Sequence, residues 1–371
     1  MKNKTKDFLL CCKTLDFGKV ELSKAESSFY QRFSNEIVSL CRSLPKSLQT
    51  PAILFLMRYS GLNLGDKLDF FPNYYPPTWS ILYWLREHDT CSANRLTKGD
   101  VTNAVTAQSM AMFLHCLDDH LIDNQVPVSG LALLLRSEAW TTMNRACSSL
   151  SEGVPLGERT ARRFMNEYYS SIQDEDGLES IDSYCGRFRR QMAIGMIAPI
   201  LLSMKMSGMS TFTRDIERAY GSFGIAWRLL DDIRDVANDI EKRAHSAIYL
   251  CLPEKLRTHW NDTRSSRTAV KDSTIVILNH IMEHRVIEKI HAKICAELEA
   301  AASLVEAHGM TGLAREFRCL AHPLTAMSVE KSKIGGTFFV NKVPPRPLQE
   351  TLTAARILNS SEGKIKDSRR R

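Results

Sequence analysis

Apolar residues recur every three or four positions along most of this chain. The clearest case runs from residue 274 to residue 307, where one face repeats apolar side chains beside charged ones (Ile277, Ile287, Ile290, Ile294, Leu298 and Ala301). Alternating apolar and polar runs bounded by Asn-Gly or Asp-Gly, which would indicate β-hairpins, are missing from the sequence. The pattern therefore predicts an all-α protein.

The same periodicity places helices near 24–43, 49–60, 102–122, 130–149, 157–173, 179–206, 212–242 and 274–307. Segments rich in proline, glycine and polar residues separate them, but none has the length of a linker between domains. We therefore predict one helical domain over residues 25–341. It follows an N-terminal segment, 1–24, and precedes a basic tail, 342–371, whose composition is typical of disorder.

Net charge says little about the body of the protein. The chain has 371 residues, is 44% apolar and 25% charged, and carries a formal charge of +7. The tail from Lys342 onward holds eight Lys or Arg against three acidic residues, which is +5 of that total. The remaining chain is close to neutral, so we expect no broad basic face and no nucleic-acid partner.

The cysteine spacing and the apolar runs bear on location. Ten cysteines are scattered without a Cys-x-x-Cys pair, as in proteins that keep free thiols in a reducing compartment. The apolar patch near the N-terminus is too short for a secretory signal. The longest apolar stretch, 192–204, contains Pro199 and falls short of the roughly 20 residues that span a bilayer. We expect a cytoplasmic protein without a transmembrane segment.

Three carboxylates interrupt the apolar helix predicted over 102–122, at its C-terminal end. Asp118, Asp119 and Asp123 lie in the segment FLHCLDDHLIDN, residues 113–124. Buried carboxylates are very unfavourable unless a positive charge neutralises them. Asp119 and Asp123 are one helical turn apart, so they can present oxygen ligands to a hard cation such as Mg²⁺.

A second acidic segment, WRLLDDIRDVANDIEKR, spans residues 227–243. Asp231, Asp235 and Asp239 repeat every four residues and form one acidic stripe, with Asp232 beside the first of them. Asp239 is equally explained as the solvated end of the helix. A single Asp-Asp pair on a helix is more often plain surface, but two pairs in apolar helices favour function. We expect the two helices to face each other and to hold several Mg²⁺ ions with a diphosphate.

With these two motifs, the sequence resembles the class I isoprenoid synthases over residues 25–325. That superfamily includes the trans-prenyl diphosphate synthases, the terpene cyclases and the squalene and phytoene synthases. The resemblance implies a single-domain helical bundle around a central apolar cavity, with both aspartate motifs at its mouth. It also implies that three Mg²⁺ ions bind the diphosphate of a small-molecule prenyl substrate, whose departure leaves an allylic carbocation.

The details of the motifs favour different subfamilies. The second motif, Asp231-Asp232-x-x-Asp235, is similar to the DDxxD of prenyl synthases, whereas DDHLID resembles variants found in terpene cyclases. Elongating enzymes also carry a Gly-Lys-x-x-Arg-Pro segment before the first motif and an Arg-Arg-Gly after it. Here the segment at 65–70 retains only Lys67, and the segment 124–130 has no arginine.

We therefore predict a Mg²⁺-dependent terpene synthase, a carbon–oxygen lyase. It would ionise an allylic prenyl diphosphate of 10 to 20 carbons, with 15 favoured, and cyclise or quench the carbocation. The alternatives are a trans-prenyl diphosphate synthase, or a non-catalytic partner subunit of one. Homodimers are common in the superfamily, so a homodimer is possible.

Four cationic residues are candidates for contact with the diphosphate. Arg187 and Arg190 precede Asp231 by 44 and 41 residues, near the place where the superfamily puts a diphosphate-contacting cation. With Asp118 and Asp119 they are the predicted catalytic residues. An arginine cluster that pairs with surface acids is an equally good explanation for either one alone. Lys242 and Arg243, at the end of the second motif, are the other two candidates.

A carbocation requires aromatic and apolar walls that exclude water. The candidates lie on the two motif helices and are Phe113, Leu114, Leu117, Phe223 and Trp227. Aromatic residues at helical spacing are more often plain core. By resemblance, a bulky residue five positions before the first aspartate, here Phe113, limits the length of the prenyl chain.

Overall fold

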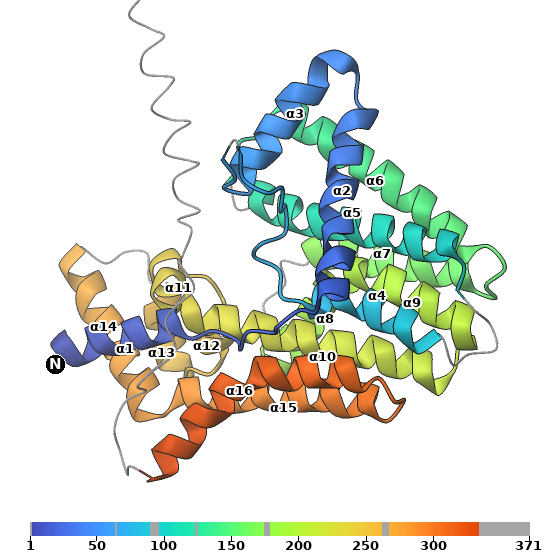
Figure 1. Ribbon diagram of the computed structural model, residues 1–371. Coiled ribbons are helices and arrows are strands. Elements are labelled where there is room, and N and C mark those ends of the chain that lie inside the picture. The colour runs from blue at the N-terminus through green and yellow to red at the C-terminus, as the bar shows by residue number, and fades with distance from the viewer. Residues whose placement is uncertain are drawn as a thin grey trace, which may run out of the picture. The chain divides into compact units, whose positions relative to one another are not determined.

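The computed structural model describes residues 2–63, 65–89, 96–122, 125–173, 179–261 and 267–333. Over these residues the protein consists of sixteen helices, and none of the described residues lies in a β-strand (Figure 1). The all-α class predicted from the sequence is confirmed. None of the described helices is both long and apolar enough to cross a membrane.

The helices fall into two groups by their internal contacts. The α2–α6 unit contains residues 22–163 and 194–213, and the α10–α16 unit contains the described residues of 2–21, 164–193 and 214–333. The predicted boundaries at residues 24 and 341 stay predictions. The basic tail, 342–371, lies outside the described residues.

The α2–α6 unit is built around a long buried helix. Its helices are α2 (Lys24–Ser43), α3 (Lys46–Tyr59), α4 (Pro77–His88), α5 (Lys98–Ile122) and α6 (Gly130–Ser151), together with the first turns of α7 (Gly157–Gln173) and most of α9 (Ala193–Ser207). Helix α5 packs against α2, α4 and, most extensively, α6. Its buried residues include every position from 107 to 114 and also Leu117 and Asp118, so the first acidic motif follows a continuously buried stretch of the helix.

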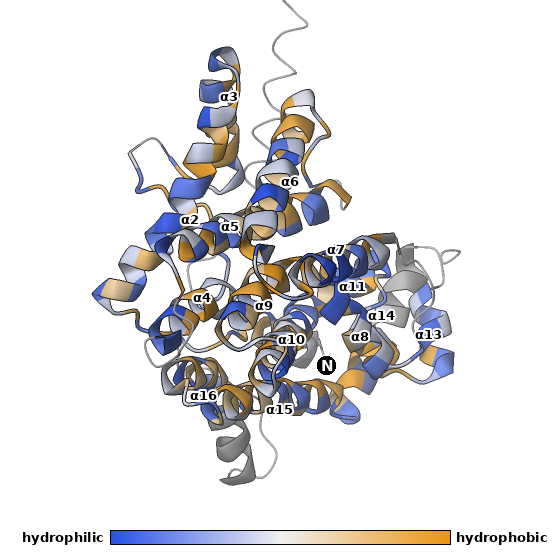
Figure 2. Cartoon of the chain, turned by 90° about the vertical axis from the view of Figure 1, so that its right-hand side faces the viewer, coloured by the Kyte–Doolittle hydropathy of each residue, from blue (hydrophilic) through white to orange (hydrophobic). Residues whose placement is uncertain are grey.

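Local sequence signals explain where the helices of this unit begin. Ser23 and Glu26 form a reciprocal capping box at the start of α2. Thr97 and Asp100 do the same at the start of α5, where Lys205 also lies 2.7 Å from the Asp100 carboxylate. Helices α2 and α7 carry hydrophilic and hydrophobic residues along their length, as helices with one buried face do (Figure 2).

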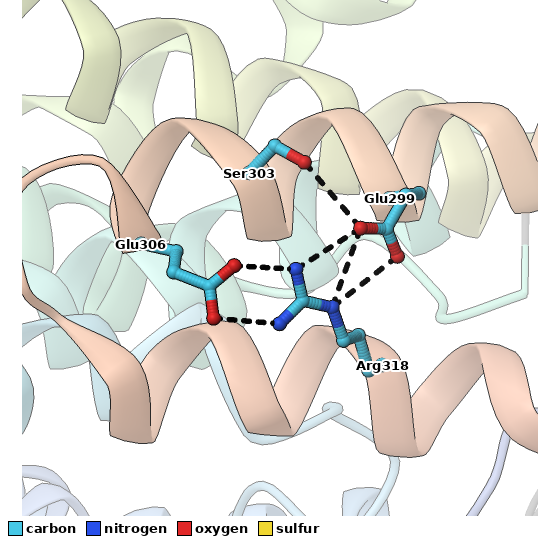
Figure 3. Close-up of polar contacts among 4 residues, drawn as sticks. All are labelled: Glu299, Ser303, Glu306 and Arg318. Atoms are coloured by element: carbon cyan, nitrogen blue, oxygen red, sulfur yellow. Dashed lines mark hydrogen bonds and ion pairs between the residues drawn. The ribbon is translucent and has the colours of Figure 1, made fainter.

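The α10–α16 unit holds the second acidic motif. Its helices are α1 (Lys2–Thr14), α8 (Ile181–Gln191), α10 (Thr211–Arg234), α11 (Val236–Lys242), α12 (Ala247–Leu250), α13 (Glu254–Asn261), α14 (Arg267–Glu283), α15 (Val286–Glu306) and α16 (Thr311–Lys333), with the end of α7. Helices α15 and α16 form an antiparallel pair, and α12 and α14 pack against α15. On the surface of that pair, Arg318 of α16 bridges Glu299 and Glu306 of α15 (Figure 3).

Three predicted helices are each interrupted. The helix expected over 179–206 breaks at Met192, whose N–H turns to the carbonyls of Phe188 and Arg190. The helix expected over 212–242 breaks at Asp235, and the one expected over 274–307 breaks before Arg285, which has a left-handed φ of 53°. None of the three is a glycine or a proline, so the sequence carries no punctuation there.

Candidate functional site

The first acidic motif ends α5, and its two described aspartates face different surroundings. Asp118 is buried, with 5% of its surface exposed. Arg136 of α6 holds both of its oxygens, with Nε 2.5 Å from Oδ1 and Nη2 3.1 Å from Oδ2. Asp119 is exposed, and Asp123 lies outside the described residues. The buried carboxylate is therefore neutralised by an arginine of the same unit.

Sequence analysis did not single out Arg136. A signal was available, because Arg136 directly follows the apolar run of residues 131–135 on α6. A charge inside an apolar helix face needs a partner just as a carboxylate does.

Aromatic hydroxyls brace the last turns of α5. Tyr59, at the end of α3, donates a hydrogen bond to Cys116 Sγ at 2.9 Å, and burial raises its pKa above the ordinary value. Tyr74 donates to the carbonyl of Met112 at 2.7 Å. These two tyrosines were also missed by sequence reasoning, and they hold the helix end that presents Asp119.

The second acidic motif ends α10, and its buried member is Asp232, with 1% exposure. Its Oδ1 accepts a hydrogen bond from the Tyr184 hydroxyl at 2.9 Å and lies 3.1 Å from Arg228 Nε. Its Oδ2 accepts from the backbone N–H of Ala247 at 2.9 Å. Both oxygens are therefore satisfied by protein groups.

Arg228 and Tyr184 also contact each other. Arg228 Nε donates to the Tyr184 hydroxyl at 2.6 Å, and its guanidinium stacks over the rings of Tyr184 and Phe188. Burial lowers the pKa of Arg228, but the nearby Asp232, Tyr184 and Asp231 outweigh it and raise that pKa well above its ordinary value. The result is a charged network of α8 and α10 inside one unit.

Two glycines of α10 allow α8 to approach so closely. A Cβ at Gly224 would lie 2.9 Å from Met192 Cγ, and one at Gly221 would lie 3.0 Å from Arg189 Nε. Because glycine has no side chain, the stem of Arg189 can lie along the α10 backbone. Tyr184, which bonds to Asp232, lies on the same helix as Arg189.

Among the described residues, no arginine donates a hydrogen bond to the side chain of Asp231 or Asp235. Asp231 has a side chain that is 47% exposed and lies 3.9 Å from Arg228 Nη1. Asp235 is exposed, and its N–H donates to the Asp231 carbonyl at 2.9 Å, which keeps the two carboxylates one turn apart across the break between α10 and α11. Desolvation by surrounding protein atoms and the charge of Asp231 raise the pKa of Asp235.

Asp239 is buried rather than solvated, so its alternative explanation as a surface residue is excluded. It is 8% exposed, and its Oδ2 has no hydrogen-bond partner within the part of the chain that the structure describes. Burial, and next the nearby Asp232, raise its pKa to about 7. An unpaired buried carboxylate oxygen on the acidic stripe is suited to a cation.

The acidic residues fit Mg²⁺ unequally. Among the described residues no three His, Cys, Asp or Glu side chains are grouped closely enough to hold a metal ion by themselves. Mg²⁺ commonly binds through one or two carboxylates and fills its other positions with water and phosphate oxygens. Asp119, Asp231, Asp235 and Asp239 offer such oxygens. For Asp118 and Asp232, arginine already supplies the neutralising charge.

The predicted diphosphate ligands lie in the α10–α16 unit. Arg187 of α8 is half-buried, and its Nε lacks a hydrogen-bond partner within the described ranges. Arg190 follows one turn later on the same helix. Lys242 is exposed, and Arg243 ends α11 in the left-handed conformation with φ of 58°. Their contact with a diphosphate stays a prediction.

The predicted cavity residues belong to both units, three to the α2–α6 unit and two to the α10–α16 unit. Phe113, Leu114 and Leu117 are buried on α5. Phe223 is fully buried, with its ring centroid 6.0 Å from that of Phe317, and so belongs to the core of the α10–α16 unit. Trp227 is half-buried, 6.1 Å from Phe223. That these residues line a cavity stays a prediction, as does the facing of the two acidic helices, which belong to different units.

Similarity to known proteins is found in the structure and not in the sequence. No protein-family model and no curated protein sequence matches the chain. A heptaprenyl diphosphate synthase from Staphylococcus aureus matches 80% of this chain and 98% of its own, with 12% identity and a TM-score of 0.55. A polyprenyl synthetase from Streptomyces coelicolor matches 80% and 99%, with 13% identity and a TM-score of 0.56.

A geranylgeranyl pyrophosphate synthase from Corynebacterium glutamicum matches 85% of this chain and 98% of its own, with 13% identity and a TM-score of 0.56. The chain therefore shares the all-α fold of these three prenyl synthases. The resemblance inferred from the two aspartate motifs is thereby confirmed at the level of fold. Within this fold, both motifs lie at the ends of long helices, α5 and α10.

Proposed function

We propose that this chain is a Mg²⁺-dependent enzyme acting on a prenyl diphosphate. The observation that carries the proposal is the pair of aspartate motifs in a class I isoprenoid synthase fold, each with an exposed carboxylate, Asp119 and Asp231. When bound, Mg²⁺ supplies positive charge that stabilises the departing diphosphate. In the α10–α16 unit, Asp231 and Asp235 would hold it, and Arg187 and Arg190 would donate hydrogen bonds to the diphosphate. In the α2–α6 unit, Asp119 is the candidate ligand.

The first candidate reaction is prenyl transfer. The solved structures of similar fold are named as heptaprenyl, polyprenyl and geranylgeranyl diphosphate synthases, which favours the prenyl diphosphate synthase that sequence analysis gave as the alternative. In this reaction the allylic carbon–oxygen bond breaks, and the double bond of a homoallylic diphosphate attacks the cation. The intermediate then loses a proton.

The second candidate, a terpene synthase, is favoured by the missing cations. A homoallylic diphosphate needs counter-charges of its own, yet Lys67 is exposed and the segment 125–130 has no arginine. Tyr74, which follows Lys67 before α4, is directed to the Met112 carbonyl. Ionisation of a single allylic diphosphate of 10 to 20 carbons, followed by cyclisation or quenching, requires no second diphosphate site.

Product analysis separates the two reactions. The full chain is incubated with geranyl, farnesyl or geranylgeranyl diphosphate, with and without isopentenyl diphosphate, in Mg²⁺ or in a chelator. Longer diphosphates that form only with isopentenyl diphosphate identify prenyl transfer, and hydrocarbons or alcohols formed without it identify a terpene synthase. No product from any combination in Mg²⁺ would overturn the proposal and would favour the non-catalytic partner subunit.

The metal assignment has its own test. Asp119→Ala and Asp235→Ala should each reduce turnover by about 10²–10³-fold, because each removes charge stabilisation at the leaving group. Circular dichroism shows whether the variants fold. Retained turnover in folded variants would refute the assignment. The cytoplasmic location and the homodimer stay predictions.

A further inference from the structure

Both aspartate motifs begin with two adjacent aspartates, and in both the two side chains differ in the same way. Asp118 and Asp232 are buried, with 5% and 1% exposure. Their neighbours, Asp119 and Asp231, are exposed or half-exposed. Adjacent residues on a helix point about 100° apart, so a pair at the edge of a buried face sends one side chain inward and one outward.

In the first motif the inward carboxylate, Asp118, pairs with an arginine of the neighbouring helix α6. Arg136 of α6 contacts Asp118 through two nitrogens and two oxygens, which is the bidentate geometry of a strong arginine–carboxylate pair. A metal ion could bind Asp118 only by displacing a guanidinium from a buried carboxylate. That exchange leaves a buried charge without its partner.

In the second motif the inward carboxylate is held more completely. Asp232 accepts hydrogen bonds from Tyr184 and from the backbone of Ala247 and pairs with Arg228. Tyr184 joins the two charged groups, because its hydroxyl donates to Asp232 and accepts from Arg228 Nε. This network ties α8 and the start of α12 to the last turn of α10, the turn that carries Asp231.

We propose that Arg136 and Arg228, with Tyr184, are positioning residues that hold one aspartate of each pair in place. The other aspartate of the pair is then available to bind Mg²⁺. Asp118 and Asp232 anchor the motif helices, and Asp119 and Asp231 bind Mg²⁺. The inference rests on the proposed function and narrows it, since seven aspartates were metal candidates from the sequence. It gives the two members of each pair opposite roles despite identical chemistry.

The test uses four substitutions of equal size in the full chain. Binding of Mg²⁺ in the presence of inorganic pyrophosphate is measured by calorimetry without any prenyl substrate, and thermal unfolding is measured alongside. Asp119→Asn and Asp231→Asn should weaken Mg²⁺ binding by about 10-fold or more and leave the melting temperature unchanged or higher, since each removes an exposed ligand.

Asp118→Asn and Asp232→Asn should show the reverse. Each leaves a half-buried arginine without its counter-charge, so the melting temperature falls, while the folded protein binds Mg²⁺ within about 3-fold of wild type. Loss of Mg²⁺ binding in a folded Asp118→Asn or Asp232→Asn variant as great as in its neighbour would overturn the proposal.

Tyr184→Phe tests positioning, because it removes one hydroxyl and keeps the ring. We expect Mg²⁺ affinity to fall by about 2- to 3-fold, no more than in Asp232→Asn, because Tyr184 acts through Asp232 and Arg228. Tyr30→Phe is the matched control, since the Tyr30 hydroxyl also donates to an aspartate, Asp69, at 2.6 Å. Tyr30→Phe should leave Mg²⁺ binding unchanged. Equal Mg²⁺ binding in both variants would show that Tyr184 has only a structural role.

Failure of this inference can be told apart from failure of the proposed function. A wild-type chain that binds Mg²⁺ with pyrophosphate and shows the expected division among the four variants, yet makes no prenyl product, refutes the function alone. A wild-type chain that makes product but loses Mg²⁺ binding equally in all four variants refutes the division alone. A chain that binds no Mg²⁺ overturns the inference whatever it makes.

Discussion

Gly18 lies between α1 and α2, where the chain passes directly over the backbone of α16. Its N–H donates to the Leu320 carbonyl at 2.9 Å. A Cβ built at this position would lie 1.9 Å from the Cys319 carbonyl oxygen and 3.0 Å from Pro323 Cδ. Gly18→Ala therefore puts a methyl group into backbone atoms of α16, which cannot turn aside as a flexible side chain can.

The size of the effect follows from the contacts that must be given up. Carbon and oxygen atoms that are not bonded come no closer than about 3.3 Å, so the segment must move by more than about 1 Å. The move breaks the hydrogen bond to Leu320, worth about 1 kcal/mol. It also exposes part of Leu15 and Phe17, each 4% exposed in the native protein, at a cost of about 1–2 kcal/mol. We expect a total loss of about 2–3 kcal/mol.

Thermal unfolding followed by circular dichroism measures this loss. About 2–3 kcal/mol corresponds to a fall in melting temperature of about 3–4 °C in a chain of 371 residues. Gly186→Ala is the matched control, because Gly186 lies inside α8 with open space around its Cα. There the better helix propensity of alanine should raise stability by up to about 1 kcal/mol. A Gly18→Ala protein that melts within about 1 °C of wild type would refute the close-approach reasoning.

Three further predictions concern ion pairs. Arg136→Met leaves Asp118 buried without a counter-charge and should lower the free energy of unfolding, measured in guanidinium, by about 2–3 kcal/mol. This value is at the low end for a buried pair because Arg136 is 33% exposed. An unchanged midpoint of unfolding would contradict this prediction. Lys205 and Thr97 outweigh burial and lower the pKa of Asp100, so its contribution is present above the unfolded pKa and is lost as pH falls through the folded one. The stability difference between wild type and Asp100→Asn, measured across pH 2–7, should therefore shrink below about pH 4, and a constant difference would refute it. Arg318→Gln should change the melting temperature by less than about 2 °C, because the ion pairs of Arg318 with Glu299 and Glu306 are exposed. A larger fall in melting temperature at low salt would contradict this and show that these ion pairs stabilise the fold more strongly.

The helical class and the places of both acidic motifs follow from the sequence. Spacings of three and four in the apolar residues report a helix because they reflect its 3.6-residue turn, which is a local property. Aspartates inside an apolar run, such as Asp118 and Asp232, indicate special surroundings because burial of a carboxylate is unfavourable in any fold. Helices α2 and α7 accordingly have the bounds that the pattern predicts, 24–43 and 157–173.

The sequence could not indicate what neutralises those aspartates. Mg²⁺ was the predicted partner for both members of each pair, yet Arg136 lies 18 residues from Asp118, and Tyr184 lies 48 residues from Asp232. Periodicity says which residues share a helix face but not which distant side chain meets that face. Helix breaks without glycine or proline, at Met192 and Asp235, depend on the same distant packing.

Phe223 and Asp239 show the same limit from opposite directions. Phe223 packs against Phe317 of α16, a partner that the sequence did not indicate, and its role as a cavity wall stays a prediction. Asp239 was as well explained by solvent, and the fold around α11 and α12 buries it instead. The sequence by itself determined a helical protein with two acidic helix ends. Only the tertiary structure decided which carboxylates are paired and which are free, because burial and ion pairing depend on contacts between segments far apart in the chain.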